Sequence, residues 1–253
     1  MSGTCLYREH TPSGLIQVWQ DGDRRSLWFD DVILQSEIDL NDPAVLPNPA
    51  NRAMLAHLMF GQQPGRVLLA GCGGGGIARW FNARSPQTRG DAVELSPEVA
   101  AVARSYFDFP PPPRWQMHVD DVRPFVARHQ GEYDFILVDL EEQQYSPDWV
   151  SSEAFLTACR EALSEQGVLT INLIPRHAEH FTGALATIRE VFARRTLCLP
   201  VAGHDNQLVI AFRQTPELAA IEQLGDTAQH WGLPLAQHWQ AIKAANPAGS
   251  GIL

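Results

Sequence analysis

A glycine run between a strand pattern and a helix pattern constrains this chain more than any other feature. Residues 67–76 read VLLAGCGGGG, and a helical pattern begins near Ile77. Glycine permits positive φ and lets a ligand approach the free N–H groups at the start of a helix. The run therefore predicts a ligand at this strand end, although a tight strand-to-helix turn would use the same residues. No Lys-Ser/Thr pair follows, which excludes a phosphate-binding P-loop.

Strand-like and helical segments alternate through the rest of the chain. RVLLAG, GDAVEL, WQMHVDD, YDFILVDL and VLTINLI read as strands separated by helical patterns, and LCLPVAG with QLVIAFRQ reads as a closing hairpin. This order predicts an α/β fold with a mostly parallel sheet covered on both faces. Residues 14–39 have strand patterns and predict a small antiparallel sheet. We expect residues 1–46 to form this appendage and its linker, and residues 47–253 to form the main domain.

Composition narrows the class of partner. Nineteen Lys and Arg against twenty-nine Asp and Glu give a net charge of −10, which offers no basic surface for nucleic acid or an anionic membrane. The negative electrostatic potential expected around such a chain favours a cationic substrate. The four cysteines are scattered without metal spacing, and neither a signal peptide nor a membrane span is evident, so we expect a cytoplasmic protein.

Acidic residues follow the next two strands at the edge where the glycine run lies. Glu94 ends its strand about 20 residues after the glycines, where a carboxylate can bind both ribose hydroxyls. Asp120 and Asp121 end the following strand and could bind an adenine amine, or could cap the helix that begins before Pro124. Because ligands of open α/β sheets bind at the carboxyl ends of strands, these residues predict a site for adenine and ribose without a pyrophosphate.

The fourth strand ends in Asp139, and a polar loop with Glu141, Glu142 and Tyr145 follows it. At this point the chain resembles the spermidine synthase family, the polyamine aminopropyltransferases, and their bacterial spermidine-synthase-like relatives. The resemblance covers residues 15–174 and includes VILQS, VLLAGCGGGG, VEL, VDD and YDFILVD. It implies a class I methyltransferase-like Rossmann fold with a seven-stranded sheet, an N-terminal β-sheet appendage and a homodimer.

The resemblance also implies roles for individual residues. Asp139 would orient the attacking amine and help to deprotonate it, and Glu142 and Tyr145 would contact that substrate. The residues implied at the nucleoside and sulfur end of the co-substrate are Gln35, Gly71, Gly73, Gly75, Glu94, Asp120 and Asp121. The co-substrate would be S-adenosylmethionine or its decarboxylated form, the acceptor a small-molecule amine, and no metal is expected. An amine must be neutral to attack, yet free alkylamines with a pKa near ~10 are protonated at pH 7, so a carboxylate there contributes directly.

Three departures from the family pattern keep other functions open. Gly74 stands where the family has an aspartate that contacts the aminopropyl amine, the loop after Asp139 is altered, and NPANRAMLAHL replaces a Tyr-His-Glu segment that helps to bind polyamine. We therefore also consider an S-adenosylmethionine-dependent methyltransferase and a non-catalytic nucleoside-binding protein. A dehydrogenase is disfavoured because the N-terminal sheet and the acid pair would then have no role. His177 and His180 lack a third metal ligand in the sequence.

Overall fold

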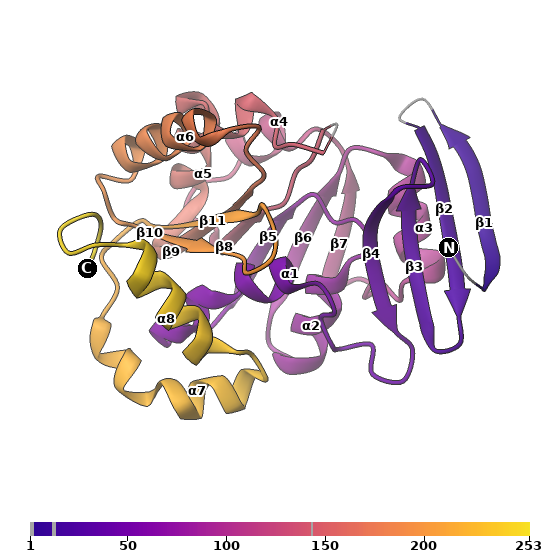
Figure 1. The fold of residues 1–253 in the computed structure, drawn as a ribbon, viewed down its shortest axis with the longest axis horizontal. Coiled ribbons are helices and arrows are strands. Elements are labelled where there is room, and N and C mark those ends of the chain that lie inside the picture. Colours follow the sequence, from indigo (N-terminus) through magenta and orange to yellow (C-terminus); the bar gives the residue numbers. More distant parts are fainter. Residues whose placement is uncertain (1–2, 12–13, 143) are drawn as a thin grey trace.

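The N-terminal part of the chain forms a four-stranded antiparallel sheet (Figure 1). The computed structural model describes residues 3–11, 14–142 and 144–253. The strands follow in the order β1 (Thr4–Thr11), β2 (Gly14–Asp21), β3 (Arg24–Phe29) and β4 (Ile33–Asp39). Strand β1 was not predicted, because its residues are mostly exposed and lack a regular alternation of polar and apolar side chains.

The rest of the chain is built on a seven-stranded sheet in the order β10-β11-β9-β8-β5-β6-β7. Strands β5 to β9 are parallel where they pair, and β10 and β11 run antiparallel as the predicted hairpin. This confirms the predicted fold class. The strands are β5 (Arg66–Ala70), β6 (Arg89–Glu94), β7 (Trp115–Val119), β8 (Tyr133–Val138), β9 (Leu163–Leu173), β10 (Thr196–Pro200) and β11 (Gln207–Phe212).

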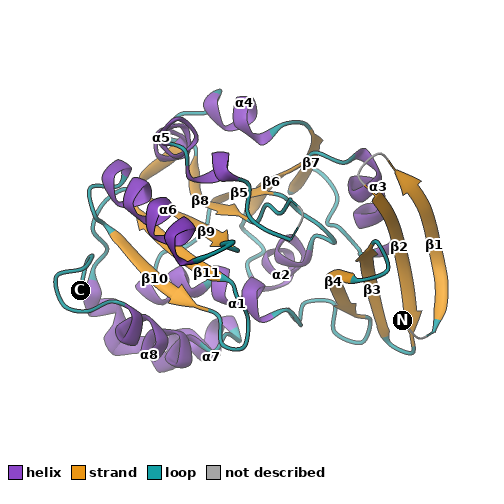
Figure 2. Ribbon diagram, turned by 45° about the horizontal axis from the view of Figure 1, so that its top comes forward, coloured by secondary structure: helices purple, strands orange, loops and turns teal. Residues whose placement is uncertain are grey.

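Helices cover both faces of this sheet (Figure 2). One apolar cluster includes residues of α1, α2, α7 and α8, and a second includes residues of α4, α5 and α6. The α-helices are α1 (Pro49–Met54), α2 (Gly76–Arg84), α3 (Pro97–Tyr106), α4 (Val122–Ala127), α5 (Glu153–Ala162), α6 (Ala178–Val191), α7 (Leu224–Trp231) and α8 (Leu235–Ala245). Short 3₁₀ helices are η1 (Ala56–Phe60), η2 (Asp148–Ser151) and η3 (Leu218–Gln223). In the described part of the chain, no helix combines the length and apolar character needed to cross a membrane.

Three segments differ from their sequence patterns. The helix predicted around residues 54–59 is split into α1, which ends at Met54, and the 3₁₀ helix η1. The Leu55 N–H bonds to the carbonyl of Arg52, three residues earlier, as in a 3₁₀ turn. The predicted helical tail is broken at Gly232, which has a φ of 65°. Strand β9 begins at Leu163, within the predicted helix, because Leu163 pairs with Tyr133 of β8.

The N-terminal sheet packs on α3 and ends beside the glycine turn. Ile16, Val18, Leu27 and Ile38 form an apolar cluster with side chains of α3 and with Phe107. This packing brings β4 next to the turn between β5 and α2. There the Gly74 N–H donates to the Ser36 hydroxyl at 2.9 Å. The N-terminal sheet therefore lies directly beside the glycine turn.

Candidate active site

A pocket lies at the carboxyl ends of β5 and β8, between the large sheet and β4. About 440 Å³ of space free of protein atoms lies here, part of it open solvent. The predicted residues Gln35, Gly71, Gly73 and Asp139 all line it. Its other lining residues are Ser36, Asn51, Met54, Leu69, Cys72, Gly76, Ile77 and Leu137.

The glycine turn needs the residues that the sequence places there. Gly71, Gly73 and Gly75 have φ values of 80°, 48° and 72°. A Cβ on Gly71 would overlap the Asp139 carbonyl oxygen and lie 3.0 Å from the Leu140 Cδ2. At Gly75 a Cβ would lie 2.6 Å from a ring carbon of Phe109. These close approaches, together with the positive φ, explain why Gly71 and Gly75 carry no side chain.

Gly74 has no space for a larger residue such as aspartate. A Cβ there would lie 2.8 Å from the Ser36 Cβ and 3.1 Å from the Phe107 Cδ1. Gln35 fills the space above Gly73 in the same way, and its Oε1 accepts a hydrogen bond from the Ser36 hydroxyl. Strand β4 thus occupies the region that a larger residue in the turn would enter.

Glu94 lies beside the glycine turn, as predicted from its position at the end of β6. Its Oε2 accepts from the Cys72 N–H at 3.2 Å, and its Oε1 accepts from the Ser96 N–H at 3.1 Å. Each carboxylate oxygen can accept a further hydrogen bond. The backbone therefore fixes this carboxylate at the edge of the turn, in a geometry that leaves acceptor capacity for two hydroxyls. Its role toward a ribose stays a prediction.

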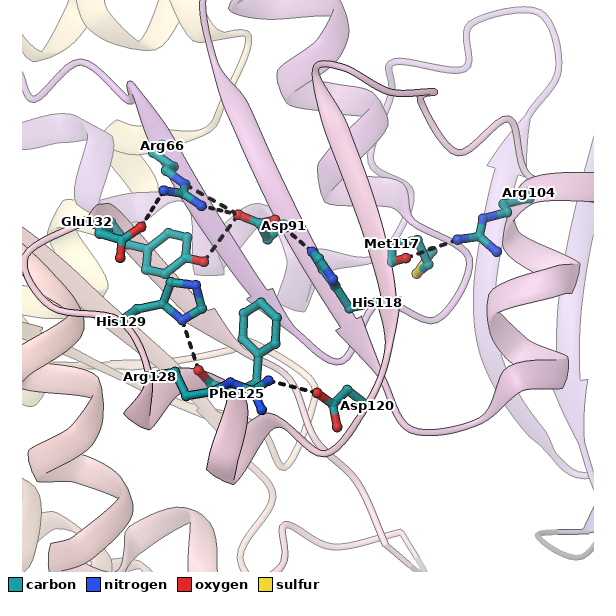
Figure 3. A network of polar contacts seen from close by, with 11 residues as sticks. Arg66, Asp91, Arg104, Met117, His118, Asp120, Phe125, Arg128, His129 and Glu132 are labelled. Atoms are coloured by element: carbon teal, nitrogen blue, oxygen red, sulfur yellow. Dashed lines mark hydrogen bonds and ion pairs between the residues drawn. The ribbon is translucent and has the colours of Figure 1, made fainter.

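The acid pair after β7 forms contacts within its own segment. Asp121 caps α4 by accepting from the Arg123 N–H at 2.8 Å, and it also pairs with the Arg123 guanidinium. Asp120 pairs with Arg128 at 2.9 Å (Figure 3). The arginine hydrogen bonds lower the pKa of both carboxyls. The helix-cap alternative is therefore observed, and contact with an adenine amine stays a prediction for both residues.

Asp139 follows β8 directly and is held by one amide. The Asn172 Nδ2 on β9 donates to its Oδ1 at 2.8 Å. Burial raises the pKa of Asp139, and the hydrogen bond from Asn172 opposes this effect. Burial and the charge of Asp139 also raise the pKa of Glu141. A carboxyl group whose charged form is disfavoured accepts a proton more readily, which suits a general base at neutral pH.

Glu142 and Tyr145 lie outside the lining of this pocket. Both are exposed, and their backbones form an isolated bridge in which the Glu142 N–H donates to the Tyr145 carbonyl at 2.8 Å. The Arg176 guanidinium lies 5.7 Å from the centre of the Tyr145 ring. One cation thus already stacks on Tyr145, and contact of either residue with a substrate stays a prediction.

Several pocket residues were not identified from the sequence. Ser36 and Asn51 line the pocket, and Asn172 binds Asp139. Arg79 is buried on α2, and its guanidinium donates to the carbonyls of Gly74 and Phe107. These hydrogen bonds fix the backbone of the glycine turn. Burial lowers the pKa of Arg79 to about 10. The apolar strand sequence VLTINLI contains two polar residues, Thr170 and Asn172, and this departure from an apolar pattern was the available signal for Asn172.

A separate ionisable network joins four neighbouring strands (Figure 3). Asp91 on β6 accepts from His118 on β7 at 2.8 Å, from Arg66 on β5 at 3.1 Å, and from the Tyr133 hydroxyl on β8 at 3.2 Å. Arg66 also pairs with Glu132. None of these residues lines the pocket. The network therefore compensates a buried charge in the sheet.

Three further residues of chemically notable types, His177, Cys72 and Trp231, have structural roles. His177 caps α6 by accepting from the His180 N–H, and the described residues contain no group of three or more His, Cys, Asp or Glu able to hold a metal. Burial raises the pKa of the Cys72 thiol, so the thiolate is disfavoured. Trp231 is 2 % exposed and lies 5.5 Å from Trp80, ring centre to ring centre, which places it in the core.

Comparison with known proteins supports the predicted resemblance. The family model of the spermine/spermidine synthase domain matches residues 49–212. The polyamine aminopropyltransferase of Chromobacterium violaceum is 32% identical over 243 residues, which cover 94% of this chain and 93% of that protein.

Solved structures share the fold. The structure of a spermidine synthase in complex with the transition-state analogue AdoDATO superimposes with a TM-score of 0.74 and 20% identity, over 94% of this chain and 85% of that one. Human methyltransferase-like protein 13 in complex with SAH gives a TM-score of 0.62 and 23% identity, over 73% of this chain and 90% of that one.

Proposed function

Because the chain belongs to the spermine/spermidine synthase domain family, we propose that it transfers an aminopropyl group from decarboxylated S-adenosylmethionine to a small-molecule amine. The observation that carries this proposal is Asp139, a carboxyl group of raised pKa that lines the pocket beside the glycine turn. The adenosyl part would lie along the turn, with Glu94 at the ribose and Gln35 near the sulfonium.

The reaction needs an amine lone pair in line with the carbon–sulfur bond. The nitrogen attacks the carbon next to the sulfonium, the carbon–sulfur bond breaks, and its electron pair neutralises the sulfur, which leaves 5′-methylthioadenosine. Asp139 would orient the amine and accept a proton that the nitrogen loses. The negative net charge of the chain suits a cationic amine as the arriving substrate.

A second candidate function is methyl transfer from S-adenosylmethionine. The observation that favours it is Gly74, because Ser36 and Phe107 leave no space for the carboxylate that would anchor an aminopropyl amine. The shared fold with the human methyltransferase-like protein agrees with this alternative. The two functions use the same pocket and differ in the group that leaves the sulfonium.

Binding and product analysis test the two functions together. Calorimetry would compare decarboxylated S-adenosylmethionine, S-adenosylmethionine, 5′-methylthioadenosine and S-adenosylhomocysteine. Mass spectrometry would then follow the product after incubation with putrescine or other polyamines. Preferential binding of the decarboxylated form and release of 5′-methylthioadenosine, lost in Asp139→Asn, are expected. Preference for the carboxylated form would instead indicate methyl transfer. Binding without turnover of either would indicate a nucleoside-binding protein.

We also propose that residues 1–46 serve as an appendage to a catalytic domain of residues 47–253, and that two copies pair in the cytoplasm. The family resemblance supports the pairing. Size-exclusion chromatography with light scattering should give a mass near twice 28.1 kDa. A monomer mass at micromolar concentration would contradict the dimer.

A further inference from the structure

Two hydrogen-bonded asparagine side chains, Asn206 and Asn172, connect the antiparallel hairpin of β10 and β11 to Asp139. Asn172, near the end of β9, is 4% exposed. Its Nδ2 donates to the Asp139 Oδ1 at 2.8 Å, and its Oδ1 accepts from the Asn206 Nδ2 at 3.0 Å. Asn206 lies in the loop between β10 and β11. These residues are 33 and 34 positions apart in sequence, and the sheet order brings them together.

Hydrogen-bond chemistry fixes the orientation of the middle amide. An ionised carboxylate can only accept hydrogen bonds, so Asn172 must turn its NH₂ group toward Asp139. The opposite side of the amide is then an oxygen that requires a donor, because an unsatisfied buried acceptor is costly. Asn206 supplies that donor. Without that donor, the Asn172 Oδ1 would be a buried acceptor with no partner, and the amide would be held less firmly with its NH₂ group toward Asp139.

The loop that carries Asn206 is itself ordered by backbone hydrogen bonds. The Val201 N–H donates to the Asn206 carbonyl at 3.0 Å, and the His204 N–H donates to the Val201 carbonyl at 3.1 Å. Because β11 is antiparallel to β9, Gln207 at its start pairs with Leu173 at the end of β9. The hairpin loop therefore lies at the same sheet edge as the pocket.

We propose that Asn172 is a positioning residue that stabilises the ionised form of Asp139 and fixes its plane, and that Asn206 sets the orientation of the Asn172 amide. Asn172 occupies the Asp139 Oδ1, which directs the Oδ2 to the incoming amine. The part of this inference that concerns the amine rests on the proposed transferase function. The part that concerns the carboxylate depends on the structure alone. Glu141 is the ionisable neighbour in the following loop, and the charge of Asp139 raises its pKa.

Asn172→Leu and Asn206→Leu test the inference, because leucine keeps the approximate size and removes the hydrogen bonds. Thr170→Val is the matched control. Thr170 is fully buried on the same strand, and its hydroxyl lies 3.3 Å from the His57 Nδ1 rather than at Asp139. The first measurement is the pKa of Asp139 by NMR of protein labelled with ¹³C at the aspartate carboxyls, with Asp139→Asn identifying the signal. This measurement needs no turnover.

Asn172→Leu should raise the pKa of Asp139, Asn206→Leu should raise it less, and Thr170→Val should leave it unchanged. The second measurement is the pH profile of 5′-methylthioadenosine release. In Asn172→Leu the acid limb should move to higher pH, and kcat should fall about ten- to hundredfold, the usual loss for a hydrogen bond to a charged group, with little change in KM for the sulfonium.

The inference is overturned if both leucine variants fold and the pKa of Asp139 stays at its original value. It is also overturned if Thr170→Val shifts that pKa as far as Asn172→Leu does. Should Asn172→Leu fail to fold, Asn206→Leu decides alone, because its side chain is only partly buried. If no sulfonium is turned over, the proposed function fails, while the NMR titration still decides the role of the two asparagines.

Discussion

Replacing Gly71 by alanine tests whether the glycine turn shapes the pocket or only connects two elements. Gly71 has a φ of 80°, which costs a residue with a Cβ about 1–2 kcal/mol. The added Cβ would also overlap the Asp139 carbonyl and crowd the Leu140 Cδ2 at 3.0 Å. Overpacking of this kind costs about 1–3 kcal/mol. The summed expectation is about 2–5 kcal/mol of stability lost.

Gly131→Ala is the matched control. Gly131 has a φ of 66°, and its Cβ would meet no atom within 4 Å. The backbone cost of about 1–2 kcal/mol is therefore shared, and the steric cost is absent. For a chain of this size about 1 kcal/mol corresponds to roughly 2–4 °C in Tm. We expect Gly131→Ala to lower Tm by roughly 2–8 °C, and Gly71→Ala to lower it by roughly 4–20 °C.

The assay combines thermal unfolding with calorimetric titration of 5′-methylthioadenosine. Relief of the overlap at Gly71 must move the backbone of Asp139, so this variant should also lose nucleoside affinity and activity. Gly131→Ala should keep both. Equal Tm values for the two variants, with equal nucleoside affinity, would refute the steric reasoning and reduce the glycine run to a simple turn.

Three further changes examine other parts of the site. Glu94→Gln should weaken binding of 5′-methylthioadenosine about 10- to 100-fold in calorimetry, since one charged acceptor is lost, and unchanged affinity would remove Glu94 from the ribose site. Burial raises the folded-state pKa of Asp139 above its unfolded value, so its stabilising contribution is present below the unfolded value near ~3.9 and is lost as pH rises through the folded one. Asp139→Asn should therefore melt higher than the parent protein at pH 7, with the difference shrinking on acidification, and a difference independent of pH would contradict the burial effect. Gly74→Asp should lower Tm without improving affinity for decarboxylated S-adenosylmethionine, because its Cβ would lie 2.8 Å from the Ser36 Cβ; adding Ser36→Gly should recover part of the loss, and tighter binding in the single variant would show that the turn can open.

Local patterns in the sequence were sufficient for the main outline. The alternation of strand and helix patterns predicted the mostly parallel sheet, because hydrophobic periodicity reports which face each element buries. The glycine run and the positions of Glu94 and Asp139 predicted the pocket edge, because the carboxyl ends of parallel strands meet at one edge. Each inference depended on residues close together in the chain.

Tertiary structure decided what fills and supports that pocket. Ser36 meets Gly74 only because the N-terminal sheet packs on α3, and Asn206 reaches Asn172 only because the last hairpin reverses direction beside β9. Neither contact has a local sequence signal, since each joins residues 34 or more positions apart. Sequence thus indicated the sheet edge at which the pocket lies, and strand order determined which side chains lie beside Asp139. The physical reason is that spatial neighbours in a sheet are set by topology rather than by distance along the chain.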